Sequence, residues 1–122
     1  MVQKGDLVEH RKALEIRLKV LGPNHPNTAE SYNNIGSVYH GKGDYENSLV
    51  ECCEALEIHL KVLEPDHSEI AISYNDIGAV YCQKGDYENA LVGHRKALEI
   101  RLKVLVPDHP NTAESYNNIG EV

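Results

Sequence analysis

Histidine and cysteine are the side chains in this sequence best able to bind a metal ion or act as a nucleophile. The 122 residues include seven His and three Cys. His25, His67 and His109 each follow the last by 42 residues and lie within two residues of a proline. Stacked helices lie roughly 10 Å apart, whereas Zn–N bonds are about 2.1 Å long, so these imidazoles cannot share one ion. We expect them to stabilise turns, and we expect no metal site.

A second recurring position holds His10, Cys52 and His94. Packing inside a core is the favoured interpretation, and a reactive thiol at Cys52 is the alternative. An odd number of cysteines, with Cys52 and Cys53 adjacent, is typical of free thiols in a reducing compartment. The sequence has no nucleophile elbow, phosphate loop or HExxH motif. We therefore expect no catalysis and no cofactor.

Charge and hydropathy exclude two classes of partner. The formal net charge is -7, from 19 acidic residues against 12 Lys plus Arg, so a phosphate backbone would be repelled. We expect no nucleic acid partner. No apolar run approaches the roughly 18 to 20 residues that span a bilayer, so we expect no membrane partner and a cytoplasmic location.

An internal repeat dominates the sequence. The tetrapeptide ALEI begins at Ala13, Ala55 and Ala97, each 42 residues after the last. Residues 10–36 match residues 94–120 at 25 of 27 positions. All seven Tyr occupy repeated positions, which predicts that they supply core bulk. Periodicity of this length is typical of stacked supersecondary units.

Each period contains two helical patterns separated by breakers. Residues 28–40 carry apolar or small side chains at the three-to-four spacing of a helix with one buried stripe; we name this the A helix. Asp44, after two glycines, is placed to cap the next helix, the B helix of residues 45–63. Proline follows each B helix. The prediction is an all-α superhelix of six helices in antiparallel pairs, without strands.

The predicted organisation is one repeat array that begins with a B helix and ends with an A helix. Its divisions are residues 1–22 (half repeat, B helix), 23–64 (full repeat), 65–106 (full repeat) and 107–122 (half repeat, A helix).

The spacing of large and small residues resembles the tetratricopeptide signature, and the 42-residue period is similar to the repeats of kinesin light chains and nephrocystin-like proteins. Glycine at two signature positions would let the A and B helices approach closely. The resemblance implies a protein-binding scaffold. The repeat-core residues are Tyr32, Ile35, Gly36, Tyr39, Ser48, Ala55, Tyr74, Ile77, Gly78, Tyr81, Ala90 and Ala97.

In such arrays the residue after the first Tyr of each A helix faces a concave groove. Asparagine amides there could bind the backbone of an extended peptide or partner protein; alternatively, they bond to neighbouring helices or were simply copied with the repeat. Acidic residues at Asp76 and Glu114 argue against a clamp for a C-terminal carboxylate. The predicted groove residues are Asn33, Asn34, Ser37, His40, Asn75, Asp76, Ala79, Cys82, Asn117 and Asn118.

The two ends predict uncovered apolar faces, because the first B helix and the last A helix each lack a partner. Self-association through these terminal helices, by head-to-tail stacking or segment exchange, is therefore a second hypothesis, and an excerpt of a longer array is the alternative. The predicted faces comprise Leu7, Ala13 and Leu14 at one end and Ala113, Tyr116, Ile119 and Val122 at the other.

Overall fold

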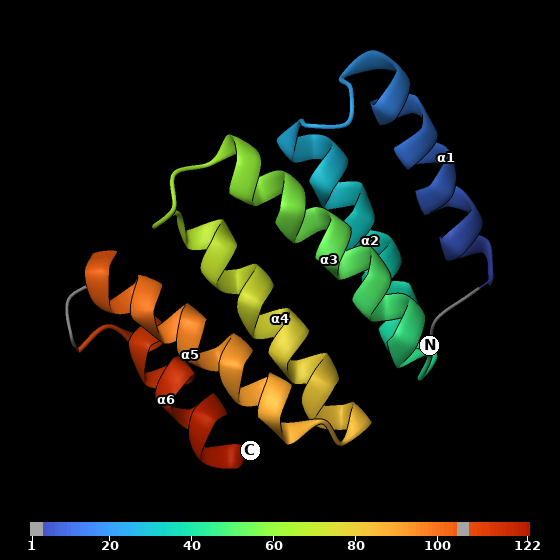
Figure 1. Ribbon diagram of the computed structural model, residues 1–122. Coiled ribbons are helices and arrows are strands. Elements are labelled where there is room, and N and C mark those ends of the chain that lie inside the picture. Colours follow the sequence, from blue (N-terminus) through green and yellow to red (C-terminus); the bar gives the residue numbers. More distant parts are fainter. Residues whose placement is uncertain (1–3, 105–107) are drawn as a thin grey trace. The chain divides into compact units, whose positions relative to one another are not determined.

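The computed structural model describes residues 4–104 and 108–122, with side chains from Leu7 onward. These residues form six helices and no strand, which confirms the all-α prediction (Figure 1). The predicted break at Val106 and Pro107 lies outside the described residues. The helices are α1 (Lys4–Val20), α2 (Pro26–Gly41), α3 (Tyr45–Val62), α4 (Ser68–Lys84), α5 (Tyr87–Val104) and α6 (Pro110–Glu121).

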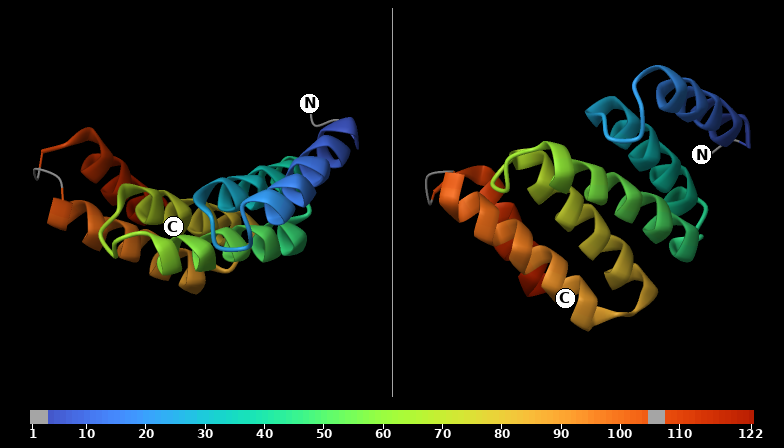
Figure 2. Two further views of the ribbon diagram at one scale, coloured as in Figure 1. Left: turned by 90° about the horizontal axis from the view of Figure 1, so that it is seen from above. Right: turned by 45° about the horizontal axis from the view of Figure 1, so that its top comes forward.

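The chain divides into two compact units, Met1–Val62 and Leu63–Val122. In the first unit α2 packs against both α1 and α3, and in the second α5 packs against both α4 and α6. Consecutive helices within each unit run antiparallel (Figure 2). The repeat boundaries expected from the sequence stay predictions.

Local turn chemistry sets where the helices start and stop. Gly43 and Gly85 adopt positive φ angles of 79° and 91°, a conformation that costs glycine little after a helix. Asp44 and Asp86 then accept hydrogen bonds from the backbone N–H groups of Asn47 and Asn89, each at 3.2 Å. Hydrogen bonds from Asn89 hold the pKa of Asp86 below its usual value. The predicted cap at Asp44 is therefore confirmed.

The three recurring histidines begin the A helices. Nδ1 of His25 accepts a hydrogen bond from the backbone N–H two residues later at 3.0 Å, and His67 and His109 do the same at 3.0 Å. Each side chain thus satisfies one of the N–H groups that lack a partner at a helix start. The prediction that these histidines stabilise turns is confirmed.

Small side chains form the contact between paired helices. Ala29, Ala55 and Ile58 are buried together between α2 and α3, with Tyr32 packed against them. One period later in the second unit, Ala71, Ala97 and Ile100 are likewise buried. Burial of this kind contributes roughly 25 cal/mol per Å² of apolar surface.

Two glycines of the A helices lie in close contact with the facing B helix. A Cβ atom added at Gly36 would lie 2.6 Å from Sγ of Cys52, and one added at Gly78 would lie 3.0 Å from the His94 ring. Ser48 Oγ donates to the Gly36 carbonyl oxygen at 2.8 Å across the first of these contacts. Glycine leaves room for the facing side chain in both pairs.

The prediction that every Tyr supplies core bulk is wrong at two positions. Tyr87 is 55% exposed and Tyr116 is 56% exposed. Tyr116 has the same neighbours in sequence as the half-buried Tyr32, so its exposure reflects the absence of a facing helix. Tyr39 is half-buried, and its hydroxyl oxygen accepts a hydrogen bond from Arg11 Nη2 at 2.6 Å.

Replacing Gly36 with Ala should lower the free energy of unfolding by about 1–2 kcal/mol in urea titrations. The added methyl group overpacks the contact with Cys52 at a cost of about 1–3 kcal/mol, which exceeds the helix-propensity gain of about 1 kcal/mol. The loss should shrink when the same change is made in a Cys52→Ala background.

Gly120 provides the matched control, because it occupies the same repeat position and a Cβ atom there would meet nothing within 4 Å. Gly120→Ala should therefore leave stability unchanged or raise it slightly. Equal losses for Gly36→Ala and Gly120→Ala would contradict the close-contact explanation.

Candidate functional site

The A helices carry polar stripes at the surface of their units. On α2 the stripe contains the exposed Glu30 and Ser37 and the half-buried Asn33 and Asn34. These residues are three or four positions apart, so they lie on one side of the helix. His40, near the end of α2, is half-buried with its ring 5.8 Å from the ring of Tyr45.

The stripes of α4 and α6 follow the same spacing. Asp76 and Ala79 are exposed on α4, while Cys82 is half-buried. Asn117 is exposed and Asn118 half-buried on α6. Every predicted groove residue except Asn75 is therefore at least partly accessible to solvent.

Asn75 is turned inward and is only 7% exposed. With its amide NH₂ directed at His94, it donates to Nδ1 at 3.0 Å, and its carbonyl oxygen accepts from Arg101 Nη1 at 2.9 Å. This orientation satisfies both ends of the amide, whereas the reverse leaves donors facing donors. At Asn75 the geometry agrees with the alternative that these amides bond to neighbouring helices. Peptide binding by the accessible amides stays a prediction.

His94 is held neutral in this network. It is 4% exposed, and burial lowers the pKa of its imidazole. Nδ1 accepts the Asn75 hydrogen bond, so protonating it would set two donors against each other. Cys52 is likewise buried, at 7% exposed, so packing is confirmed at two of the three residues in this recurring position, whereas His10 is half-buried.

Arg101, near the end of α5, links this helix to the middle of α4 and to the start of α6. Its guanidinium donates to Ser115 Oγ at 2.8 Å, to the Asn111 carbonyl oxygen at 2.9 Å and to Glu114 Oε1 at 3.1 Å, besides its bond to Asn75. The residue is only 6% exposed, and a buried charge of this kind requires several such partners. Arg101 therefore fixes α4 and α6 side by side, with their polar stripes at the surface.

Arg17 forms the equivalent clamp in the first unit. Its Nη1 donates to the Asn27 carbonyl oxygen at 2.7 Å, to Ser31 Oγ at 2.9 Å and to Glu30 Oε1 at 3.0 Å. Reasoning from the sequence missed both arginines. The available signal was an arginine four residues after the alanine of the first and third ALEI motifs, on the same side of the helix; the second motif has His59 there.

These ion pairs change the electrostatics of the stripes. Glu30 pairs with Arg17, and Glu114 pairs with Arg101. Each acidic residue is thereby balanced by a neighbouring cation, so the stripes are less negative than the net charge alone suggests.

The cysteines offer little nucleophilic chemistry. All three are free thiols. Burial, followed by repulsion from Glu57 and Glu54, raises the pKa of the exposed Cys53 thiol. A raised pKa leaves a smaller fraction as thiolate, which is the reactive form.

The described residues contain no group of His, Cys, Asp and Glu side chains that could hold a metal ion. Within the same part of the chain, no helix combines the length and apolar character needed to cross a bilayer.

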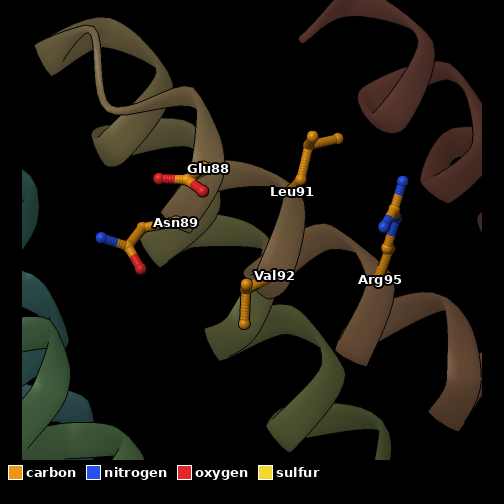
Figure 3. Close-up of a pocket in the computed structure, with 5 residues that line it drawn as sticks. All are labelled: Glu88, Asn89, Leu91, Val92 and Arg95. Atoms are coloured by element: carbon orange, nitrogen blue, oxygen red, sulfur yellow. The ribbon is translucent and has the colours of Figure 1, made fainter.

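Surface hollows lie along single helices. One of about 410 Å³ runs along α5, and in Figure 3 its lining side chains spread from the helix without converging on one point. Another lies on α1 beside Lys12, Glu15, Ile16 and Lys19. Neither brings together groups that could act on a substrate. The lining residues on α5 are Glu88, Asn89, Leu91, Val92 and Arg95.

The sequence pattern of the tetratricopeptide repeat family matches residues 9–50, 32–92 and 69–122. The chain belongs to this family. Tetratricopeptide repeats generally mediate contacts between proteins, and the recognition made from the repeat-core residues is confirmed. No curated protein sequence matches the chain.

Solved structures share the tetratricopeptide fold. BtubC (BKLC) from P. vanneervenii matches with a TM-score of 0.86 and 23% identity, over 94% of this chain and 46% of that one. Two crystal structures of a Podosopora anserina putative kinesin light chain with nearly identical TPR-like repeats also match, with TM-scores of 0.84 and 0.83 and 20% identity. Each match covers 98% of this chain and 58% of that one. The chain thus spans about half the length of these proteins, and the likeness concerns the fold alone.

Acidification should weaken the second unit through His94. Because the pKa of this imidazole is lowered in the folded state, the unfolded state binds a proton first as the pH falls below about 6.5. Stability is therefore complete above that pH and decreases towards the lower folded-state pKa, where the loss levels off. Urea titrations between pH 7.5 and 5 measure this decrease.

The His94→Cys variant provides the control, since cysteine occupies the same position in α3. Its unfolding free energy should depend less on pH over this range. An unchanged dependence would mean that other groups cause the loss.

Replacing Arg101 with Met should loosen α6. The change leaves Ser115 and Asn75 without a charged donor, and hydrogen bonds to charged groups contribute about 1.5–3 kcal/mol. Amide hydrogen exchange should accelerate throughout α6.

Arg17→Met is the matched comparison. The Arg17 side chain is 30% exposed against 7% for Arg101, so amide exchange in α2 should be affected less. A larger effect at Arg17 would contradict the assigned role of burial.

Proposed function

We propose that each unit of the chain binds an extended segment of a partner protein along the polar stripes of its A helices, and that the chain acts by binding rather than by catalysis. The supporting observation is the network of Asn75, Arg101 and Ser115, which holds α4 and α6 side by side while their stripes remain accessible. Membership of the tetratricopeptide repeat family supports the same proposal.

The accessible side chains suit recognition of a peptide backbone. Asn118 on α6 and Asn34 on α2 occupy the same repeat position, and an amide can donate to a carbonyl oxygen and accept from an N–H group. Ser37 lies one turn beyond Asn34 on α2, and Ala79 occupies the same repeat position on α4; both are exposed. Their small size leaves space for a chain to approach the helix surface.

In this proposal Asn75 supports the binding surface without touching the partner. Both ends of its amide are occupied by His94 and Arg101, so it orients the network rather than contacting the partner. Its replacement would act on stability first, which makes it unsuitable as a test of binding.

Charge favours a neutral or basic partner segment. The chain has a net charge of -7, whereas Glu30 and Glu114 on the stripes are balanced by arginines. A polypeptide can supply both backbone hydrogen bonds and positive charge, and we propose neither nucleic acid nor a membrane as the partner.

The double variant Asn34→Ala/Asn118→Ala should weaken binding of peptides selected against the native chain. Peptides from a displayed library of random 12-residue sequences serve as probes, and calorimetric titration measures the affinity. Each unit loses one hydrogen bond, which costs about 0.5–1.5 kcal/mol, so affinity for the peptide at each unit should fall roughly 2- to 13-fold.

Arg95→Ala is the matched control, because Arg95 is exposed on α5, away from the stripes. It should leave the affinity unchanged. Binding that survives the double variant but is lost in Arg95→Ala would overturn the proposed surface.

A further inference from the structure

The outer face of α1 lacks the cover that its counterparts possess. Ile16 is 62% exposed, whereas Ile58 and Ile100, one and two periods later, are 5% and 8% exposed. Those two isoleucines are buried where α3 and α5 pack against A helices. The side chain of Ile16 therefore marks a B-helix face that is not packed against an A helix.

The outer face of α6 is an A-helix face that is not packed against a B helix. A Cβ atom at Gly120 would meet no atom within 4 Å, whereas one at Gly36 or Gly78 would press on the facing B helix. Tyr116 is 56% exposed. Among the terminal residues expected to be uncovered, Ala113 and Tyr116 are exposed, and Leu7, Ala13, Leu14, Ile119 and Val122 are half-buried.

The two uncovered faces are made of the same residues as the paired ones. Residues 10–20 are identical to residues 94–104 of α5, and residues 110–120 are identical to residues 26–36 of α2. The chain thus contains two examples of an A helix packed on a B helix, and it exposes one further copy of each half.

We propose that α6 of one molecule packs against α1 of a second copy, in the register that pairs α4 with α5. In this interface Gly120 faces His10 of the second copy, as Gly78 faces His94. Ala113 and Tyr116 pack on its Ala13 and Ile16, as Ala29 and Tyr32 pack on Ala55 and Ile58. The contact is head-to-tail, because each molecule contributes its α6 face to one neighbour and its α1 face to another.

Polar and steric details support a second copy as the occupant. The Asn117 amide would meet the His10 ring, reproducing the hydrogen bond of Asn75 with His94 at 3.0 Å. Glu9 occupies the position of Glu51, which the α2–α3 contact already accommodates. An unrelated apolar partner would leave the Asn117 amide and the His10 ring without hydrogen-bond partners, which would weaken binding.

Gly120→Leu is a selective test, because a Cβ atom at Gly120 meets nothing within 4 Å in the molecule, whereas a side chain there would collide with His10 of the second copy. Sedimentation velocity should show the average mass of the native chain rising with concentration from the micromolar to the high micromolar range. The variant should keep its helical circular dichroism and associate at least 10-fold more weakly.

Glu121→Leu is the matched control, because its counterparts Ser37 and Ala79 are exposed beside complete helix pairs. It should associate like the native chain, as should the Asn34→Ala/Asn118→Ala variant. A native chain that stays monomeric throughout, or a Gly120→Leu chain that associates as strongly as the native one, would overturn the proposal.

A disulfide experiment checks the register. His10→Cys and Gly120→Cys chains, each also carrying Cys53→Ser, are mixed and oxidised. The geometry at Gly36 and Cys52, with 2.6 Å between the added Cβ atom and Sγ, puts cysteines at these positions within bonding reach. Mass spectrometry should identify a peptide linking residues 10 and 120 in the mixture. Its absence despite association would contradict the register.

Discussion

The contact between paired helices at Gly36 and Gly78 sets the spacing on which the rest of the structure depends. A missing side chain on one helix lets a cysteine or histidine of the other lie directly over its backbone. The adjacent alanines then bury fully. Gly93 brings α5 closer still, because a Cβ atom there would lie 2.9 Å from the Tyr74 carbonyl oxygen. Hydrophobic burial holds the pairs together, but glycine determines how near they can come.

A second layer of order comes from two arginines, on α1 and α5, that link a B helix to the A helix that follows it. Arg17 and Arg101 each bind a carbonyl oxygen, a serine and a glutamate near the start of the following A helix. The guanidinium donors of both arginines thus find acceptors on the A helix that follows. The orientation of the surface stripes is therefore coupled to buried polar contacts as well as to apolar packing.

The fold followed from the sequence because periodicity reports directly on which residues must be buried. Glycine, aspartate and the recurring histidines marked the helix ends for reasons that are local to each turn. Side-chain direction at Asn75 was not predictable in this way. Its position borders both solvent and the facing helix, and the outcome depends on His94 and Arg101, which lie far from it in sequence. Identical neighbours likewise failed to predict the exposure of Tyr116.

The sequence identity between α2 and α6 bears on how the chain selects partners while it folds. Since residues 26–36 and 110–120 are the same, α3 presents a surface that either segment could occupy. Over these eleven residues only connectivity distinguishes them: residues 42–44 join α2 to α3, whereas residues 63–109 separate α3 from α6. The entropy of closing the longer loop favours the neighbour by about 2 kcal/mol. Roughly one chain in thirty that refolds from the denatured state would then form the wrong pair first, and reaching the native arrangement would require that pair to dissociate.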